Sequence, residues 1–257
     1  MLVQNNYDIY WNGCSFVQGM ELENSKTDCF TNLVSEHFNA DWFRNSKIGG
    51  SNDRIWRVSM EDALIGRKPK LAVIVWSGIN RLEYLNDANL WRQVGFTSFV
   101  FDKVKYKTLD ISKIYYHPDM TNKQYNGFKN YVLHSRTMKY NLINSINYMI
   151  SLRHFYNSQG IPHLFYMMSN GQIDPGLKYL DEKREEAANI QWSPANRMKL
   201  KDYLREVPEL TSEGIYDMTK GKVPYGPKDH PLEEGHQLIA DRIIKDIYEK
   251  RLDKIFN

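Results

Sequence analysis

The chain has 257 residues, of which 42% are hydrophobic and 25% are charged. This composition can fill the core of one large soluble domain, or of one domain with an insertion. The formal charge of +3 and the scatter of the basic residues argue against strong attraction to nucleic acid or to anionic lipid. We therefore expect neither a nucleic-acid nor a membrane partner, and the sequence leaves the oligomeric state open.

The cysteines and the N-terminus bear on the compartment. Cys14 and Cys29 are too few for a disulfide framework, which favours a reducing environment. The N-terminal residues MLVQNNYDIYW lack the basic and then apolar segments of a signal peptide, and no apolar run approaches the roughly 18 residues that cross a bilayer. We therefore expect a soluble, cytoplasmic protein.

Strands and helices are predicted to alternate in the first third of the chain. The expected order is a strand at 7–13, a helix at 28–39, a strand at 40–50, a helix at 51–66 and a strand at 69–78. Ser51 is a suitable cap for the second of these helices. The last strand, PKLAVIVWSG, is a continuous β-rich run suited to burial on both faces. This order predicts a parallel sheet with right-handed crossovers.

The rest of the chain is less regular in its middle. Residues 92–136 are rich in Tyr, Lys and Asn without sustained periodicity, which indicates an insertion that serves as a lid or a partner surface. We then expect a helix at 137–160, a strand at 161–170, a charged helix at 179–207 and an amphipathic helix within 230–256. Because there are no repeats or linkers, residues 1–257 are expected to form a single domain.

Three of the predicted strands end in unusual residues. The first ends in Gly13-Cys14-Ser15, the second in Gly49-Gly50-Ser51-Asn52, and the third in Ser77-Gly78-Ile79-Asn80. In open parallel α/β sheets, ligands bind beyond the carboxyl ends of the strands. The order and spacing of these segments, together with DHPLEEGH near the C-terminus, indicate a functional site at that edge of the sheet.

These segments resemble the conserved blocks of the SGNH (GDSL-type) hydrolases. NGCSFVQG is similar to the first block, Gly-Asp-Ser-Phe-x-x-Gly, with Cys14 in place of the Asp. KIGGSNDRI is similar to the second block, and VWSGINR to the third, with Arg81 in place of an Asp. DHPLEEGHQLIAD is similar to the last block. The resemblance implies an α/β fold of three layers, flavodoxin-like, with a parallel central sheet and an inserted segment.

The resemblance also implies roles for individual residues. Ser15 takes the position of the nucleophile and His230 that of the base, and a serine needs such a base within hydrogen-bond reach. The oxyanion would be met by the backbone N–H groups of Ser15 and Gly50 and by the side-chain amide of Asn80. Gly49 is the alternative to Gly50 in that role.

The acid partner of His230 departs from the family pattern. The family places an Asp three residues before the catalytic His, and here that residue is Pro227. Asp229, adjacent to His230, is the first candidate for the acid. Asp217 and a backbone carbonyl are alternatives, and a Ser–His dyad without an acid would retain some catalysis.

The same residues allow other interpretations. Ser15 is also a suitable helix cap, and Cys14 is a second possible nucleophile, although the alignment places it one residue early and facing the core. His236 is interpreted as structural. No cluster has metal-ligand spacing, and IGGSND lacks the Lys or the third Gly of a phosphate-binding loop. No cofactor is therefore expected.

The resemblance implies a serine esterase or carbohydrate O-deacetylase that acts on small esters or acetylated carbohydrates. The alternative is a member of the fold that binds a carbohydrate or a host surface without cleaving it, since Cys14, Arg81 and Pro227 all replace an Asp. The GCSF and GGSNDRI variants resemble bacteriophage and marine bacterial proteins, which implies a virion-associated location if the chain is phage-encoded.

Overall fold

The computed structural model describes the parts of the chain that build the core and the candidate site. The described residues are 7–79, 81–85, 90–96, 114–115, 121, 123, 126–127, 138–169, 206–207, 209 and 212–256.

The core of the molecule is a parallel sheet. Its strands are β1 (Ile9–Asn12), β2 (Trp42–Arg44), β3 (Leu71–Trp76) and β7 (His163–Met167), in the order β2-β1-β3-β7. All three pairings are parallel. The residues of β1 and β3 are buried throughout, and β3 is the continuous apolar run that is typical of a sheet covered on both faces. The parallel sheet expected from the sequence is confirmed.

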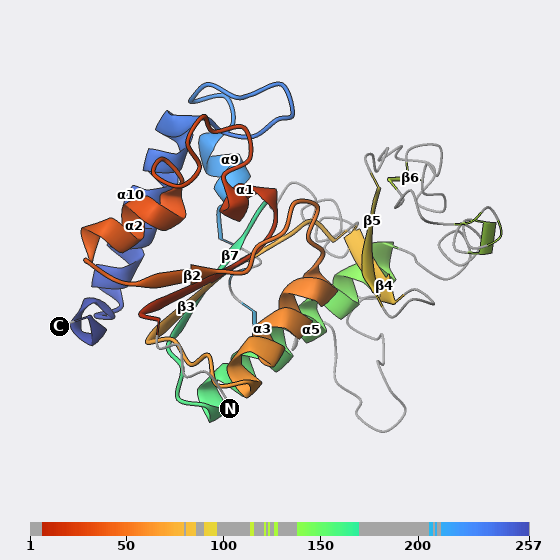
Figure 1. Cartoon of the computed structure of the whole chain (residues 1–257), viewed down its shortest axis with the longest axis horizontal. Helices are drawn as coiled ribbons and strands as arrows, with labels where there is room; N and C mark the ends of the chain where they lie inside the picture. Colours follow the sequence, from red (N-terminus) through yellow and green to blue (C-terminus); the bar gives the residue numbers. More distant parts are fainter. Residues whose placement is uncertain are drawn as a thin grey trace, which may run out of the picture.

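Helices cover both faces of this sheet, so the fold has three α/β/α layers (Figure 1). One face carries α1 (Ser15–Gln18), α2 (Phe30–His37), α9 (Ile215–Thr219) and α10 (Glu233–Glu249), and the other carries α3 (Asn52–Leu64) and α5 (Met138–Ser158). Alternate residues of β1 enter the two cores: Ile9 and Trp11 face the α2–α10 side, and Tyr10 faces the α3–α5 side.

A second, antiparallel sheet stands beside the first. It consists of β4 (Arg81–Leu85), β5 (Trp91–Phe96) and β6 (Ile114–Tyr115), in that order. These strands were not predicted from the sequence, and β5 overlaps the start of the expected insertion. The hairpin is tied to α3 by an ion pair between Arg57 and the buried Glu83. Most of 92–136, and nearly all of the helix expected at 179–207, lies outside the described residues.

Local details of the β1–α1 segment set up the site. Ser15 is the first residue of α1, and Cys14 holds the cap position. The helix ends at Gly19 with φ +71°, and Glu21 has φ +74°. At α3, Ser51 is the cap residue as expected, but its hydroxyl bonds the Asp53 carboxylate instead of a backbone N–H.

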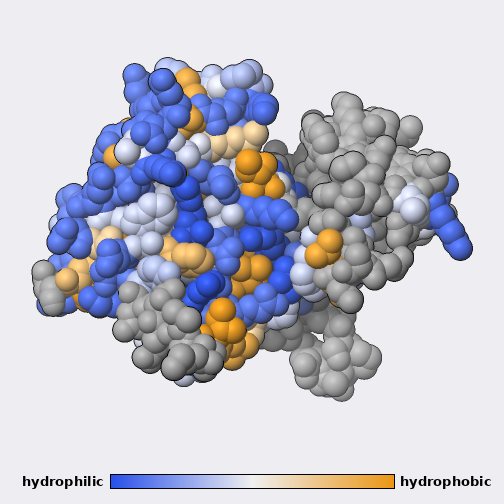
Figure 2. Space-filling view, viewed as in Figure 1, coloured by the Kyte–Doolittle hydropathy of each residue, from blue (hydrophilic) through white to orange (hydrophobic). Residues whose placement is uncertain are grey.

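The surface of the described residues has no single apolar face in the view shown. Hydrophobic residues appear there as separate small groups among hydrophilic ones (Figure 2). None of the helices within the described ranges is both long enough and apolar enough to cross a membrane.

Candidate active site

Ser15 and His230 meet where β1 ends. The Nε2 atom of His230 lies 2.7 Å from the Oγ atom of Ser15, although the two residues are 215 positions apart in the chain. Both are buried, with 4% of Ser15 and 8% of His230 exposed. The ring of Phe16 packs 5.0 Å from the imidazole. The structure therefore brings together the two residues that the sequence paired.

The turn after β1 directs the Ser15 hydroxyl toward the imidazole. A side chain at Gly13 would meet Val17 Cγ2 at 2.4 Å and the Val75 carbonyl at 2.9 Å, so only glycine fits there. Cys14 is fully buried, and its Sγ lies 3.6 Å from the Sδ of Met168. The thiol therefore faces the core, as interpreted from the sequence, and the next residue presents its hydroxyl.

The partner of the other imidazole nitrogen is Glu21, which the sequence analysis missed. Glu21 Oε2 lies 3.1 Å from His230 Nδ1 and accepts the backbone N–H of His230 at 3.2 Å. Glu21 Oε1 accepts the backbone N–H of Lys228 at 2.8 Å. Only 9% of the Glu21 side chain is exposed. One carboxylate thus holds both the ring and the backbone of the loop that carries it.

The chain around Glu21 is shaped for this contact. Glu21 has the left-handed φ of +74°, which costs a non-glycine residue of order 1–3 kcal/mol and is maintained only when the surroundings impose it. A side chain at Gly226 would come within 2.6 Å of the Glu21 Cδ and Oε1 atoms. Gly226 therefore leaves open the space that the carboxylate occupies.

Asp229 does not take the position expected for it. Its carboxylate accepts the Tyr216 hydroxyl at 2.8 Å and pairs with Lys220, and 56% of its side chain is exposed. These contacts, the one from Lys220 first, lower the pKa of Asp229. Asp229 has φ +64°, which turns it toward α9 while the adjacent His230 faces Ser15. The alternative, Asp217, accepts a bond from Ser169 at 2.9 Å.

Gly49 and Gly50, the glycines of the second block, differ in the hydrogen bonding of their backbone N–H groups. The N–H of Gly50 donates to the Lys47 carbonyl at 2.8 Å, so this expected oxyanion donor is engaged. A side chain at Gly50 would lie 3.0 Å from the Gly13 carbonyl, which places this glycine directly against the turn that carries Ser15. Gly49 has φ +74°, and within the described ranges no hydrogen bond of its N–H is found. Asn80 lies outside the described residues.

The charge on Glu21 fixes the form of the imidazole. Burial by itself would raise the pKa of Glu21, but the hydrogen bonds from Lys228 and His230 outweigh it and the pKa lies below its ordinary value. An ionised carboxylate can only accept, so His230 Nδ1 must be the donor toward it. In the tautomer with the proton on Nδ1, Nε2 is an acceptor and the Ser15 hydroxyl donates to it.

The second histidine of the last block is structural, as interpreted from the sequence. His236 is fully buried, its Nδ1 accepts the N–H of Phe30 at 3.2 Å, and its ring stacks on the Phe30 ring at 5.5 Å. Burial lowers the pKa of His236 to about 4, and the positive charge of Arg44 adds to this shift. The ring is therefore neutral at pH 7 and closes the contact between α10 and α2.

No metal site is found among the described residues, where no group of three or more His, Cys, Asp or Glu side chains could hold an ion. Cys14 and Cys29 are both free thiols, and both are buried.

Comparisons with known proteins place the chain in one family. Residues 18–255 match the model of a family of unknown function (DUF6071), and the chain belongs to this family. No curated protein matches it. Similar solved structures include a carbohydrate esterase, described as having divergent catalytic and non-catalytic binding functions in its active site (15% identity, TM-score 0.47), and an acetyl xylan esterase, Est2A, from the rumen bacterium Butyrivibrio proteoclasticus (11%, TM-score 0.45). The matches cover 97% and 94% of this chain, but 70% and 63% of those chains.

Proposed function

We propose that this member of the DUF6071 family is a serine hydrolase that cleaves small esters through an acyl-enzyme on Ser15. The observation that carries the proposal is the unbroken chain of hydrogen bonds from Ser15 Oγ to His230 Nε2 and from His230 Nδ1 to Glu21 Oε2. A nucleophile, a base and a group that orients the base are the three parts that acyl transfer by a serine requires.

The reaction runs in two halves. As Ser15 Oγ bonds to the ester carbonyl carbon, its proton passes to His230 Nε2, and the imidazolium returns that proton to the departing alcohol oxygen when the C–O bond breaks. In the second half a water molecule gives its proton to Nε2 and attacks the acyl carbon. The Ser15–carbonyl bond then breaks, Ser15 recovers its proton, and the carboxylic acid leaves.

Glu21 is the proposed acid of the triad. Its carboxylate keeps the Nδ1 proton in place, so Nε2 is free to accept, and it stabilises the imidazolium that forms during both halves. Because its pKa is lowered, it keeps its charge across the neutral pH range. We assign Asp229 a structural role instead: its contacts with Tyr216 and Lys220 hold the His230 loop against α9.

The oxyanion requires donors beside Ser15. The N–H of Ser15 is one, since the first residue of a helix has no acceptor in a preceding turn and carries the positive end of the helix dipole. The side chain of Asn80 is the second proposed donor. Of the two glycines we favour the N–H of Gly49, because that of Gly50 is bonded to Lys47.

The substrates we propose are small esters, with O-acetyl groups on sugars as the first class to assay. The proposal rests on the resemblance of the sequence blocks to esterases and deacetylases. A panel of acetylated monosaccharides and xylan oligomers, assayed beside p-nitrophenyl acetate, would establish whether a sugar alcohol improves kcat/KM.

The decisive experiment is labelling with a fluorophosphonate probe, which reacts with activated serines. The wild type should be labelled and Ser15→Ala should not, while Ser158→Ala, which removes an exposed hydroxyl at the end of α5, should be labelled normally. A folded wild type that is not labelled would contradict the proposed hydrolase and favour a binding protein.

Two matched carboxylate-to-amide variants test the acid. Glu21→Gln should lower kcat by about 10³-fold, because its amide would donate to Nδ1 and leave the proton on Nε2. Asp229→Asn should stay within about fivefold of the wild type. Equal losses in the two variants would contradict the assignment of the acid role to Glu21 and not to Asp229. A larger loss in Asp229→Asn would assign that role to Asp229.

A further inference from the structure

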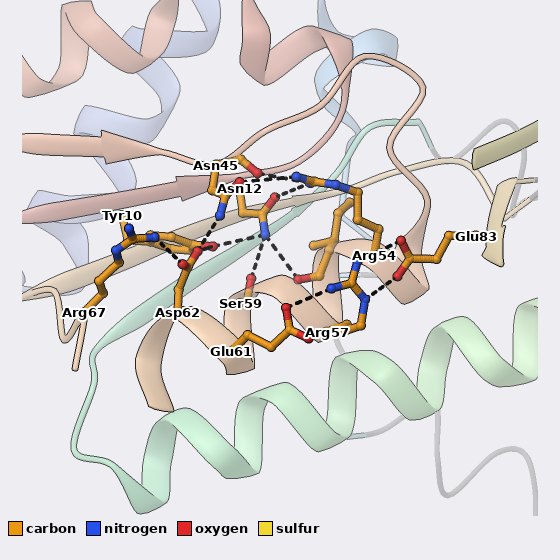
Figure 3. Close-up of polar contacts among 11 residues, drawn as sticks. Tyr10, Asn12, Asn45, Arg54, Arg57, Ser59, Glu61, Asp62, Arg67 and Glu83 are labelled. Carbon is orange, nitrogen blue, oxygen red and sulfur yellow. Dashed lines mark hydrogen bonds and ion pairs between the residues drawn. The ribbon is translucent and has the colours of Figure 1, made fainter. Parts of the chain in front are cut away.

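A buried polar network lies behind the nucleophile turn, on the α3 side of the sheet (Figure 3). It joins three segments that are far apart in the sequence: the end of β1, the segment that follows β2, and helix α3. The side chains concerned are Tyr10, Asn12, Asn45, Arg54, Ser59 and Asp62. None of the roles proposed for Ser15, His230 and Glu21 requires these groups.

Arg54 is the residue that bridges two of these segments. Its Nη1 donates to the Asn45 carbonyl at 3.0 Å and to Asn12 Oδ1 at 3.4 Å, and its Nη2 donates to Asn45 Oδ1 at 3.2 Å. Arg54 is 8% exposed. In the described part of the chain these acceptors are all neutral, whereas Arg57 and Arg67 pair directly with carboxylates. A buried cation without a direct counter-ion is costly to keep.

Asn12 carries the effect to the nucleophile. It is fully buried and is the last residue of β1. Its Oδ1 accepts the N–H of Gly13 at 2.7 Å, and its Nδ2 donates to Ser59 Oγ at 2.9 Å and to the Ile55 carbonyl at 3.2 Å. The side chain is thus held by α3 and in turn holds the backbone two residues before Ser15.

Asn45 carries the effect to the second block. Its backbone N–H donates to the Trp11 carbonyl at 2.9 Å, and two residues later the N–H of Lys47 donates to the Gly13 carbonyl at 3.2 Å. The segment 45–50 therefore runs along the nucleophile turn and brings Gly49 and Gly50 beside it. Arg54 bonds both the side chain and the carbonyl of Asn45 at the start of this segment.

We propose that Arg54 is a positioning residue for the reaction, which clamps the segment 45–50 against the turn that carries Ser15. The inference rests on the proposed hydrolase function. Arginine suits the task because its planar guanidinium presents several donors in a fixed fork and can hold acceptors on two segments at once, whereas a lysine ammonium is a single point on a flexible stem. The variant that tests the clamp is therefore Arg54→Lys.

The matched control is Arg57→Lys. It makes the same substitution in the same helix, at an arginine that bonds Glu61 and Glu83 and not Asn12 or Asn45. Both variants lose a guanidinium with polar partners, so both lower stability. Only Arg54→Lys should affect the site.

The first measurement is amide hydrogen exchange, which does not depend on any activity. In Arg54→Lys the N–H groups of Asn45, Lys47 and Gly50 should exchange at least about tenfold faster than in Arg57→Lys, because the clamp no longer holds the bonds that protect them. Unchanged protection of these three amides would overturn the proposal, whatever the activity of the protein.

The second measurement is the rate of fluorophosphonate labelling, together with kcat and KM for p-nitrophenyl acetate, below the unfolding transition of each variant. Arg54→Lys should lower the labelling rate and kcat by about tenfold with KM nearly unchanged, and Arg57→Lys should stay within about twofold. The pH midpoint of labelling should not move, since the Ser15–His230–Glu21 chain is untouched. Adding Asn45→Ala to Arg54→Lys should cause a further loss smaller than that of Asn45→Ala in the wild type, because the two side chains share one hydrogen bond while Asn45 also bonds Asp62.

The outcomes separate the two proposals. Equal labelling rates for Arg54→Lys and Arg57→Lys would reduce the network to a structural role and overturn the inference, with the hydrolase function intact. A wild type that does not label at all would contradict the hydrolase function and the positioning role together, while the exchange data would still report whether the clamp exists.

Discussion

At the scale of single residues, the unusual feature of this site is the source of its carboxylate. Glu21 comes from the segment that follows the nucleophile, six residues after Ser15, and not from the loop that carries His230. The proposed nucleophile and the proposed acid thus belong to one short stretch, and the loop that carries His230 is held between them. The strained backbone of Glu21 and the space left by Gly226 are both explained by this arrangement.

Gly226→Ala tests that arrangement without replacing any of the three proposed catalytic side chains. The added methyl would come within 2.6 Å of the Glu21 carboxyl, which can swing away because it is the end of a flexible side chain. We expect kcat to fall by about tenfold or more and the free energy of unfolding to change by less than about 1 kcal/mol. In a Glu21→Gln background the same substitution should have almost no further effect on kcat. An additive loss would mean that Gly226 acts by some other route.

His236 makes stability depend on pH. Its pKa is about 4 in the folded protein, against an ordinary value of 6.5. Between these pH values the unfolded chain binds more protons than the folded one, so stability falls as the pH is lowered from 6.5 to 4. The contribution of this residue over that window is about 3 kcal/mol. Urea unfolding of the wild type and His236→Gln at several pH values measures it.

The glutamine variant keeps an oxygen that can accept the N–H of Phe30 but cannot titrate. Its free energy of unfolding should therefore depend less steeply on pH between 6.5 and 4 than that of the wild type. The exposed His37, whose ring contacts Tyr248, provides the control variant His37→Gln. Parallel pH curves for the wild type and His236→Gln would contradict the assignment of this dependence to His236.

At the scale of elements, the loop that carries His230 forms a small hairpin, and helix α10 packs against it. The N–H of Gly226 bonds the His230 carbonyl at 2.9 Å, and the N–H of Leu232 bonds the Pro224 carbonyl at 3.1 Å. The first turn of α10 packs closely on this hairpin, because a side chain at Gly235 would lie 2.5 Å from the Pro231 Cβ and 3.0 Å from the Val223 Cγ2.

Gly235→Ala should therefore reverse the usual effect of glycine replacement in a helix. In an open helical position, alanine is about 1 kcal/mol more favourable than glycine. Here the methyl must displace the ring of Pro231, so we expect lower stability and a slower fluorophosphonate reaction, as His230 moves away from Ser15. A more stable variant with an unchanged labelling rate would contradict this prediction, since Pro231 would then move without loss of stability and without shifting His230.

The sequence predicted these elements unevenly, for physical reasons. The strand at 71–76 and helices α3 and α10 have strong apolar patterns and lie within their predicted ranges, and so does α5, although its apolar residues are not confined to one face. The β4–β5 hairpin was missed because its strands have only five and six residues, too few for a local pattern to identify them. Helix α9 has five residues, too few for periodicity to detect.

At the scale of the whole molecule, the site depends on bringing the two ends of the chain together. The positions of Ser15 and His230 could be predicted because each occupies a fixed place in an ordered set of sequence blocks. The acid could not be predicted, because Glu21, with its left-handed backbone, contacts His230 only when residues 226–230 pack against it. Asp229 was the first candidate because it is adjacent to His230 in the sequence. The hydrogen bond from the Gly50 N–H to the Lys47 carbonyl likewise forms only in the folded loop.

Because α10 packs against the His230 loop, we expect activity to be lost when the whole core unfolds and not through earlier loosening of this loop. Ile243 is 1% exposed on the face of α10 that enters the core. Ile243→Ala should lower the free energy of unfolding by about 2–5 kcal/mol, while kcat below the unfolding transition stays near the wild-type value. Leu238→Ala, at a residue of the same helix that is 41% exposed, should do little to either quantity. Thermal loss of fluorophosphonate labelling in Ile243→Ala should follow its unfolding curve, because Ser15 and His230 should remain in contact for as long as the core between α2 and α10 is folded. Labelling that disappears well before the unfolding transition would instead mean that the terminal helix detaches on its own.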